Sequence, residues 1–390
     1  MSAVPLTEAF PFFTEEHEML RTSLRRFVRE RIEPVAVQWE EAGFVPREVL
    51  REMGELGFLG IRYPQAYGGS ALDTLATAVL AEELGRSSFG GFAVTVLVHT
   101  DMATPHLLHA GSAAQKQRYL PDLIAGRKIA AVAMTEADAG SDLQGMRTRA
   151  QRTAEGWVLD GSKMFITNGV HGDVFFVAAK TDGGGGARGR GISMFIVERG
   201  TPGFRVARPL AKQGWLCSDT AELVFEDCRL PAEALLGVEN RGFYALVKNL
   251  QNERIVLGAQ AMGEAARAIE LTLAWVTQRK AFGRTLWDMQ AIRQRLAQRA
   301  AQVEAVRSLV FTTAWRDAQG QQVSKEVSMI KALAGTLVNE VMYDCLQFHG
   351  GMGYMRETAI ERMARDARVQ AIGGGATEVM LEEVAKRLVA

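Results

Sequence analysis

An acidic and a basic residue, Glu253 and Arg254, are adjacent in a stretch with helical periodicity. This stretch continues to about Arg279 without a proline. Spacings of three and four residues place Glu253 on one stripe with mainly apolar neighbours. The stripe comprises Leu246, Asn249, Leu250, Val256, Leu257 and Gln260. Loss of hydration raises the pKa of a carboxylate, which would suit Glu253 to removing a proton. Helix periodicity alone favours a plainer alternative, a solvated glutamate beside Arg254 on an exposed face.

Two stretches could form one face of a ligand site. Residues 134–142 include Thr135 and Ser141, and their small size lets backbone amides approach a ligand closely. Phe165 and Thr167 lie on the same side of a predicted strand, because strand side chains alternate. An aromatic surface beside a hydroxyl suits a flat heteroaromatic cofactor. From the spacing alone, an ordinary core strand ending in threonine is the more common structure.

Three further stretches could hold an anionic part of a ligand. They are a basic cluster at a helix end, a glycine turn after a helix and the start of the last helix. Their candidate residues are Arg279, Phe282, Gln290, Gln347, Gly350, Gly351, Thr377 and Glu378. Taken singly, each stretch is equally typical of an exposed loop, a helix stop or a helix cap.

Metal and thiol sites are not expected. No carboxylate or thiolate follows the histidines at a spacing that would complete a metal site, so we expect these histidines to pack within helices. The cysteines are widely spaced and lack a Cys-x-x-Cys pair, so we expect reduced core residues. The residues concerned are His99, His106, His109, Cys217, Cys228 and Cys345.

The charge balance argues against nucleic acid as a partner. Among 390 residues, Lys and Arg number 45 and Asp and Glu also number 45, so there is no pervasive positive field. The amino terminus has no positive segment before an apolar run, and no apolar run approaches membrane-spanning length. We therefore expect a cytoplasmic protein with neither a signal peptide nor a membrane span.

The hydrophobic period divides the chain into three parts. Helical patterns fill residues 1–127, short alternating runs rich in Val, Phe and Ile fill residues 128–238, and long helical patterns return in residues 239–390. We expect an all-helical domain, a compact β domain (barrel or sandwich) and a helical bundle. Within the β domain, Asp160-Gly161 and Asn168-Gly169 are typical hairpin-turn dipeptides.

Together, in this order, these stretches resemble the acyl-CoA dehydrogenase family over nearly the whole chain. Further points of resemblance are Gly69, Tyr119-Leu120-Pro121 and Lys212-Gln213-Gly214. The resemblance implies an α+β multidomain fold with an N-terminal helical domain, a middle β domain and a C-terminal four-helix bundle. It also implies a homotetramer, built as a dimer of dimers, with FAD bound partly across a subunit interface. The implied reaction is α,β-dehydrogenation of an acyl-CoA to the trans-2-enoyl-CoA in fatty acid β-oxidation, with electron-transfer flavoprotein as acceptor.

The resemblance assigns cofactor contacts to individual positions. Thr135 and Thr167 match hydroxyls that bond the flavin ring, Phe165 matches an aromatic residue packed beside it, and Ser141 matches a loop residue shared by flavin and acyl-CoA. The segments that would hold the rest of FAD contain Arg279, Phe282, Gln290, Gln347, Gly350, Gly351, Thr377 and Glu378. Ala137 departs mildly from the family pattern, which usually has proline there.

One departure bears on the mechanism. Many members carry the catalytic glutamate in a Tyr-Glu-Gly-Thr segment, where this chain has Gly373-Gly374-Gly375-Ala376. The isovaleryl-CoA and long-chain branches also lack that glutamate and carry a Glu-Arg pair that matches Glu253-Arg254. The resemblance thus implies that Glu253 removes the α-proton while a hydride leaves the β-carbon for flavin N5. The backbone N–H of Gly374 and a ribityl hydroxyl would polarise the thioester carbonyl, and Arg254 would orient Glu253 or hold substrate.

Other functions remain open on the sequence alone. A flavin-bearing, nucleic-acid-associated binding protein of the same fold would carry a basic extension or patch, which this neutral chain lacks. An acyl-CoA oxidase or a flavin monooxygenase shares the fold and passes electrons to oxygen. The acyl chain is also open, since isovaleryl, citronellyl and straight long chains are all compatible with a base on the central helix.

Overall fold

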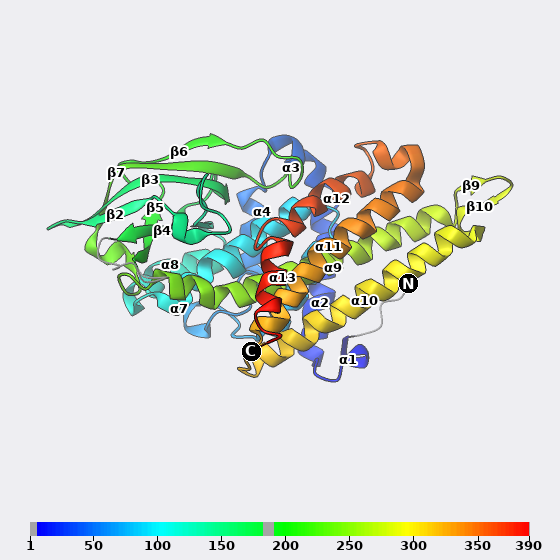
Figure 1. Ribbon diagram of the computed structural model, residues 1–390, viewed down its shortest axis with the longest axis horizontal. Coiled ribbons are helices and arrows are strands. Elements are labelled where there is room, and N and C mark those ends of the chain that lie inside the picture. Colours follow the sequence, from blue (N-terminus) through cyan, green and yellow to red (C-terminus); the bar gives the residue numbers. More distant parts are fainter. Residues whose placement is uncertain (1–5, 182–190, 390) are drawn as a thin grey trace.

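The computed structural model describes residues 6–181 and 191–389, apart from the side chains of residues 6–7 and 243–248. Leu246, one of the residues of the predicted Glu253 stripe, is among those side chains. Helices come first, strands follow, and helices return, which confirms the predicted α+β architecture. Figure 1 shows the sheet at one end of the molecule and the long C-terminal helices reaching to the opposite end.

The N-terminal region is helical. Its helices are α1 (Leu6–Ala9), α2 (Glu15–Phe27), η1 (Val28–Ile32), α3 (Ala36–Ala42), α4 (Arg47–Glu55), η2 (Gln65–Tyr67), α5 (Thr74–Gly85), α6 (Gly90–Leu97), η3 (Val98–Ala103), α7 (Thr104–Ala110) and α8 (Ala113–Ile124). Helix α5 is buried along its whole length and begins where the Asp73 carboxylate accepts the Ala76 N–H at 3.0 Å. Ser112 and Gln115 form the capping box that starts α8.

A π-helical turn, η3, interrupts the helical pattern between α6 and α7. The N–H of Thr104 bonds back to the carbonyl of His99, five residues earlier. An extra residue in a helical turn leaves carbonyl groups without their usual intrahelical donors. Pro105, four residues after Asp101, has no N–H to donate to the Asp101 carbonyl. This carbonyl and that of Met102 accept a side-chain amide of α9, as described below.

The middle region is an eight-stranded mixed sheet in which β1 pairs with β4 and the remaining strands run in the order β6-β7-β3-β2-β4-β5-β8. Its strands are β1 (Ala130–Ala133), β2 (Arg149–Arg152), β3 (Gly156–Thr167), β4 (Val174–Thr181), β5 (Ile192–Glu198), β6 (Phe204–Pro209), β7 (Thr220–Pro231) and β8 (Leu235–Leu236), with short turns η4 (Leu143–Gly145) and η5 (Ala232–Ala234). Strand β4 is buried on both faces: Phe176 packs in the cluster that contains Leu120 of α8, and Phe175 packs with Trp157 on the other side.

The predicted hairpin turn at Asp160-Gly161 is wrong. Strand β3 continues through these residues, and its register against β7 shifts between Leu159 and Gly161. Gly161 has a φ of +143°, and a Cβ there would lie 2.7 Å from the Cα of Thr148. An Asp-Gly pair relaxes the backbone for a bulge as readily as for a turn, so the dipeptide alone does not distinguish the two.

The C-terminal region is built on α9 (Gly242–Val276), α10 (Gln290–Ala318), α11 (Ser324–His349), α12 (Ala359–Ala367) and α13 (Thr377–Ala385), with β9 (Lys280–Ala281), β10 (Arg284–Thr285) and the turns η6 (Leu286–Asp288), η7 (Gly350–Tyr354) and η8 (Arg368–Ala371). Glycines let α9 approach two neighbours closely. A Cβ at Gly258 would lie 2.2 Å from Ile330 of α11, and one at Gly263 would lie 2.1 Å from the Glu82 carbonyl of α5. Within the described residues, no helix has both the length and the apolar character needed to cross a membrane.

One buried carboxylate connects all three regions. Asp366 of α12 accepts the N–H of Gly90, at the start of α6, at 2.9 Å and the N–H of Trp215, in the middle region, at 2.5 Å. Backbone N–H groups that are buried need such acceptors. These bonds hold the sheet and the N-terminal helices in fixed positions on the C-terminal helices.

Candidate active site

Glu253 is buried on α9, with 5% of its surface exposed, which excludes the solvated-face alternative. Residues one to two turns further along the same stripe are also buried, including Val256, Leu257 and Gln260. Burial raises the pKa of Glu253 to about 7. The Asp101 carboxylate also raises it, while a hydrogen bond from Asn249 and the charge of Arg254 act in the opposite direction. A carboxylate with a pKa near neutrality can both accept and release a proton.

Asn249 fixes the position of the Glu253 carboxylate, and sequence reasoning missed this role. Its Nδ2 donates to Oε1 of Glu253 at 2.9 Å and to the carbonyls of Asp101 and Met102 at 3.0 and 3.2 Å. Both carbonyls belong to η3. The spacing of four residues between Asn249 and Glu253 was the available signal, since such pairs meet on a helix.

Arg254 does not form an ion pair with Glu253 in the part of the chain that the structure describes. Its side chain is half-buried, and its Nε has no hydrogen-bond partner within the described residues. The guanidinium still lowers the pKa of Glu253 through space. The resemblance implied that Arg254 would orient Glu253 or hold substrate. In the structure, the side chain that contacts and orients Glu253 is Asn249.

The glycine segment 373–375 lies against α9 at Leu257. Gly374 has a φ of +67°, and a Cβ there would lie 2.3 Å from Cδ1 of Leu257, one turn after Glu253. Lys331 of α11 is buried and donates to the carbonyls of Gln370 and Gly375 at 2.6 and 3.0 Å, which holds the segment in place. The Gly374 N–H has no acceptor among the described residues. It is therefore available to a ligand carbonyl.

Residues 134–142 are attached to β3 by a buried ion pair. Nζ of Lys163 lies 2.7 Å from Oε1 of Glu136 and also donates to the carbonyl of Met134 at 3.0 Å. The Glu136 carboxylate accepts the N–H groups of Arg147 and Thr148 at 2.6 and 3.0 Å. Buried charges are tolerated when they are paired and fully bonded, as here.

This attachment brings Thr135 next to Phe165. The N–H of Met164 donates to the Thr135 carbonyl at 2.9 Å. Phe165 is 66% exposed and has a φ of +61°, although a large aromatic side chain is normally buried and seldom adopts that conformation. Ile166 beside it is buried, and Thr167 is half-buried on the exposed side of the strand.

These residues fit the flat ring system of a flavin. An exposed aromatic face in a strained backbone conformation indicates a surface shaped for a ligand rather than for the core. The hydroxyls of Thr135 and Thr167 can donate to or accept from a heteroaromatic ring. Ser141 lies further along the same loop and is exposed. The donor set therefore matches the cofactor that the sequence predicts.

The residues predicted to hold the rest of FAD lie away from this surface. Arg279 and Phe282 belong to the β9–β10 hairpin, which Figure 1 shows at the end of the molecule opposite the sheet. Phe282 is 95% exposed and has a φ of +53°. Within one chain, the hairpin and the Phe165 surface are thus not brought together. Four further residues, at the start of α10, near the end of α11 and in η7, are all exposed: Gln290, Gln347, Gly350 and Gly351.

A pocket adjoins these helix ends. It measures about 320 Å³ and is lined by residues that include Trp275, Gln278 and His349. The rings of Trp275 and His349 stack with centroids 5.3 Å apart, and Nε1 of Trp275 donates to the Phe348 carbonyl at 3.1 Å. The pocket is formed by α9, α11, η7 and α12.

Thr377 and Glu378 begin α13. Thr377 is the first residue of the helix and not its cap, because Ala376 takes the cap position with extended backbone. Its hydroxyl donates to the Ala371 carbonyl at 3.4 Å, and Glu378 is exposed. Both residues follow shortly after the glycine segment that lies against Leu257 of α9.

The histidines of the N-terminal region have structural partners or apolar surroundings. His99 is buried, with Nδ1 2.9 Å from the N–H of Ala130 and Nε2 2.9 Å from the Leu123 carbonyl. Burial lowers the pKa of His106 to about 4. Within the described residues there is no group of three or more potential ligands that could hold a metal ion.

Comparison with known proteins gives matches along nearly the whole chain. Models of the acyl-CoA dehydrogenase N-terminal, middle and C-terminal domains match residues 14–127, 131–228 and 240–389. The chain is 42% identical over 377 residues to the mitochondrial long-chain specific acyl-CoA dehydrogenase of Mus musculus, covering 97% of this chain and 87% of the relative. It is 35% identical over 380 residues to the mitochondrial isovaleryl-CoA dehydrogenase of Pongo abelii, covering 97% and 90%.

The fold agrees with solved structures as well. A crystal structure of acyl-CoA dehydrogenase from Geobacillus kaustophilus superposes with a TM-score of 0.93 at 39% identity. That match covers 97% of this chain and 99% of the other. Identity and coverage of this size relate the two chains as members of one family.

Proposed function

Because the chain belongs to the acyl-CoA dehydrogenase family, we propose that Glu253 is the base that removes the α-proton of its acyl-CoA substrate. The protein is an oxidoreductase that uses FAD to dehydrogenate a CH–CH bond of an acyl-CoA. Bound FAD supplies the acceptor for the hydride that leaves the β-carbon. The residues of this chain must then bind the thioester, acidify the α-proton and take it.

The observation that carries this assignment is the buried carboxylate of Glu253, which lies one helical turn before Leu257, the residue that the Gly374 segment approaches. Burial removes water that would stabilise the carboxylate, and the pKa of Glu253 accordingly rises to about 7. Deprotonated Glu253 accepts the α-proton, and Asn249 holds Oε1 in place through its 2.9 Å bond. Positioning of this kind accounts for a large part of the rate in reactions between bound groups.

Gly374 supports the proposed step from the other side of the thioester. Its free N–H would donate to the thioester carbonyl and stabilise the negative charge that develops as the proton leaves. Lys331 holds the segment through the Gly375 carbonyl at 3.0 Å. The absence of a Cβ at Gly374 also leaves the room that the substrate needs beside Leu257. We assign Arg254 to binding the acyl-CoA, because its guanidinium forms no ion pair with Glu253 and is free to contact substrate.

The flavin ring is assigned to Thr135, Phe165 and Thr167, with Ser141 between flavin and acyl-CoA. The remaining cofactor residues of the proposal are Arg279, Phe282, Gln290, Gln347, Gly350, Gly351, Thr377 and Glu378. Because the hairpin lies at the opposite end of the molecule from Phe165, the hairpin residues would serve the cofactor of a neighbouring subunit. A homotetramer, electron-transfer flavoprotein as acceptor, a role in β-oxidation and a cytoplasmic location belong to the same proposal.

Anaerobic flavin absorbance tests the proposed function. Purified, flavin-loaded protein is titrated with isovaleryl-, octanoyl-, palmitoyl- and citronellyl-CoA. Bleaching of the main flavin band by at least one of them is the expected result. Bound flavin that none of these thioesters bleaches would contradict the proposal. Oxygen consumption measured without an added acceptor separates a dehydrogenase from an oxidase.

A further inference from the structure

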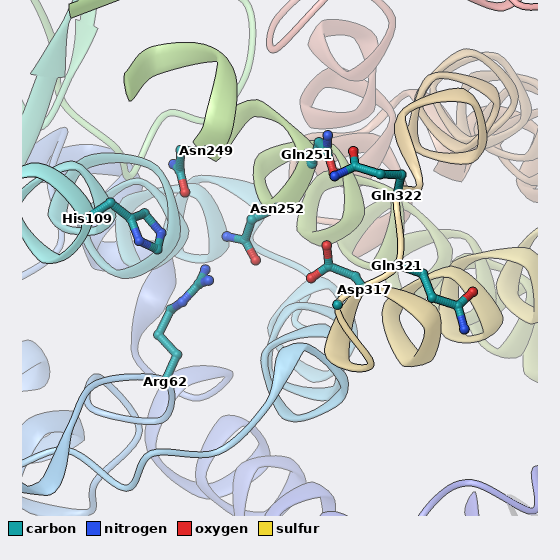
Figure 2. Close-up of a pocket in the computed structure, with 9 residues that line it drawn as sticks. Arg62, His109, Asn249, Gln251, Asn252, Asp317, Gln321 and Gln322 are labelled. Atoms are coloured by element: carbon teal, nitrogen blue, oxygen red, sulfur yellow. The ribbon is translucent and has the colours of Figure 1, made fainter. Parts of the chain in front are cut away.

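A second pocket lies beside Glu253, and its lining is polar. It measures about 260 Å³ and is lined by Arg62, His109, Asn249, Gln251, Asn252, Asp317, Gly320, Gln321 and Gln322. These residues come from the loop after α4, from α7, from α9, and from the end of α10 with the loop that follows it. Figure 2 shows the side chains of Arg62, Asn252 and Asp317 converging on one space. Gln321 and Gln322 are exposed at its outer side, while Asn249 and Asn252 are buried.

The buried side chains of Asn249 and Asn252 each have an amide oxygen that receives no hydrogen bond from the described residues. Nδ2 of Asn249 is committed to two carbonyls and to Glu253, and Nδ2 of Asn252 donates to the Asp101 carbonyl and to Oδ1 of Asp101 at 3.1 and 3.2 Å. Since all these partners accept, the amide nitrogens must face them. The Oδ1 atoms of both residues consequently have no partner among the described residues. Asn249 and Asn252 are only 1% and 6% exposed.

The charges around the pocket disfavour an anion. NH1 of Arg62 lies 3.3 Å from Oδ1 of Asp101, so the guanidinium already has a carboxylate partner. Asp317 adds a second carboxylate, which accepts the Thr74 hydroxyl at 2.6 Å. A ligand carboxylate would meet two like charges and one cation that is already paired. A neutral O–H or N–H group would instead satisfy the free amide oxygens.

The pocket connects directly to the proposed base. Asn249 lines the pocket and donates to Glu253, so one side chain separates the proton-transfer site from the polar space. With its α-carbon at Glu253, an acyl chain that passes Asn249 would place its far end in this pocket, which Asn249, Gln251 and Asn252 of α9 line. An apolar end would leave two buried acceptors unpaired, which costs free energy.

We propose that this pocket binds the far end of the acyl chain and selects an acyl-CoA that carries a neutral hydrogen-bond donor there, a hydroxyl group. The inference rests on the proposed function, since it names the substrate class of that same site. The Oδ1 atom of Asn252 accepts the hydroxyl proton, with Asn249 as the second acceptor. Sites built to bond a hydroxyl strongly reject analogues that lack it, because the protein group is left unpaired.

The test compares three acyl-CoA series of increasing chain length on the unaltered, flavin-loaded protein. One series ends in a methyl group, one in an ω-hydroxyl and one in an ω-carboxylate. We expect the best ω-hydroxyacyl-CoA to reduce the flavin with a kcat/KM about tenfold or more above its methyl counterpart. Equal or better values for the methyl series, or a preference for the carboxylate, would overturn the inference. If no thioester of any series bleaches the flavin, the proposed function itself fails.

The variant Asn252→Leu supplies an independent test, because it removes one free acceptor at similar volume and does not touch Glu253. We expect the ratio of kcat/KM for the hydroxyl and methyl substrates to fall about tenfold, mainly through a lower value for the hydroxyl substrate. The control is Asn339→Leu, which removes a half-buried amide of α11 that bonds the Gly335 carbonyl at 2.7 Å. An unchanged ratio in Asn252→Leu, or an equal fall in Asn339→Leu, would refute the assignment. The substrate comparison above stands even if Asn252→Leu does not fold.

Discussion

The side-chain amide of Asn249 and the carboxylate of Glu253 are hydrogen-bonded across one turn of α9, with Nδ2 and Oε1 2.9 Å apart. The same nitrogen donates to the carbonyls of Asp101 and Met102 in the π-turn η3. Glu253 is thereby fixed to the N-terminal region through one amide. The position of the proposed base thus depends on an irregular turn that is remote in sequence.

Loss of the Asn249 amide should move the pH dependence of the reaction. The hydrogen bond lowers the pKa of Glu253 against the larger effect of burial, so Asn249→Leu raises that pKa above about 7. Glu253 acts as a base only when deprotonated. The acidic limb of kcat/KM should therefore shift to higher pH by about one unit, with a loss of about fivefold at pH 7 that approaches tenfold at lower pH.

The pH profile of flavin reduction measures this shift. Asn339→Leu serves as the control, because Asn339 bonds the carbonyls of Gly335 and Ala367 and not Glu253. A uniform decrease across all pH values in Asn249→Leu, with the limb in its original place, would speak against a positioning and pKa-setting role.

The glycine segment offers a matched pair of substitutions. Gly374→Ala introduces a Cβ 2.3 Å from Leu257 at a φ of +67°, whereas the nearest atom to a Cβ at Gly373 is 3.6 Å away. Displacement of the Gly374 N–H should lower the rate of flavin reduction about 100-fold or more. Gly373→Ala should retain most of the rate. Equal rates in the two variants would show that the Gly374 amide is not part of the reaction.

The Glu136 carboxylate should control retention of FAD. Glu136→Gln leaves the buried ammonium of Lys163 without its counter-charge, which typically costs about 3–5 kcal/mol. The loop that carries Thr135 then loses its attachment to β3. We expect a lower flavin-to-protein ratio after purification and a weaker FAD affinity by fluorescence titration. The control is Asp138→Asn, at an exposed ion pair on the same loop, and a similar loss there would contradict the prediction.

A second buried carboxylate on α9 should make stability depend on pH. Burial raises the pKa of Glu264 from about 4.5 to about 8. A raised folded-state pKa means that the folded state holds the proton more tightly, so this contribution to stability is complete below about pH 4.5 and disappears as the pH rises through 8. Replacing the carboxylate by an amide removes that dependence.

Relative to the parent, Glu264→Gln should therefore be more stable at pH 9 by about 2–4 kcal/mol, and similar to it at pH 5. Urea unfolding at the two pH values gives the free energies of unfolding. The same substitution at the exposed Glu55 should change them by less than about 0.5 kcal/mol. A stability difference for Glu264→Gln that is the same at both pH values would rule out this source of pH dependence.

Much of the fold follows from local pattern. The proline-free period of α9 predicted a long helix, because helix geometry repeats within a few residues. The bulge at Gly161 was not predictable from the sequence, because an Asp-Gly pair permits either a hairpin turn or a bulge. The pairing with β7 selects the bulge. Local chemistry predicts which conformations are allowed, and distant contacts decide among them.

The site shows the same limit more strongly. Helix periodicity alone favoured a solvated Glu253, and only the resemblance pointed to a buried base. Its partner Asn249 is oriented by carbonyls in η3. The contact between Gly374 and Leu257 joins segments more than a hundred residues apart. The polar pocket beside Asn252 combines four elements that no sequence spacing relates. Such features depend on tertiary packing, so they became visible only in the folded chain.

The most direct test of the account compares Glu253→Gln with Glu264→Gln, the same change at two buried positions of one helix. Both variants are purified with FAD bound and mixed anaerobically with the best acyl-CoA of the titration, and flavin absorbance is followed in a single turnover. The account predicts that Glu253→Gln reduces its flavin about 1,000-fold more slowly than the parent, while Glu264→Gln stays within about twofold. Reduction at the parent rate by folded, flavin-loaded Glu253→Gln would contradict it.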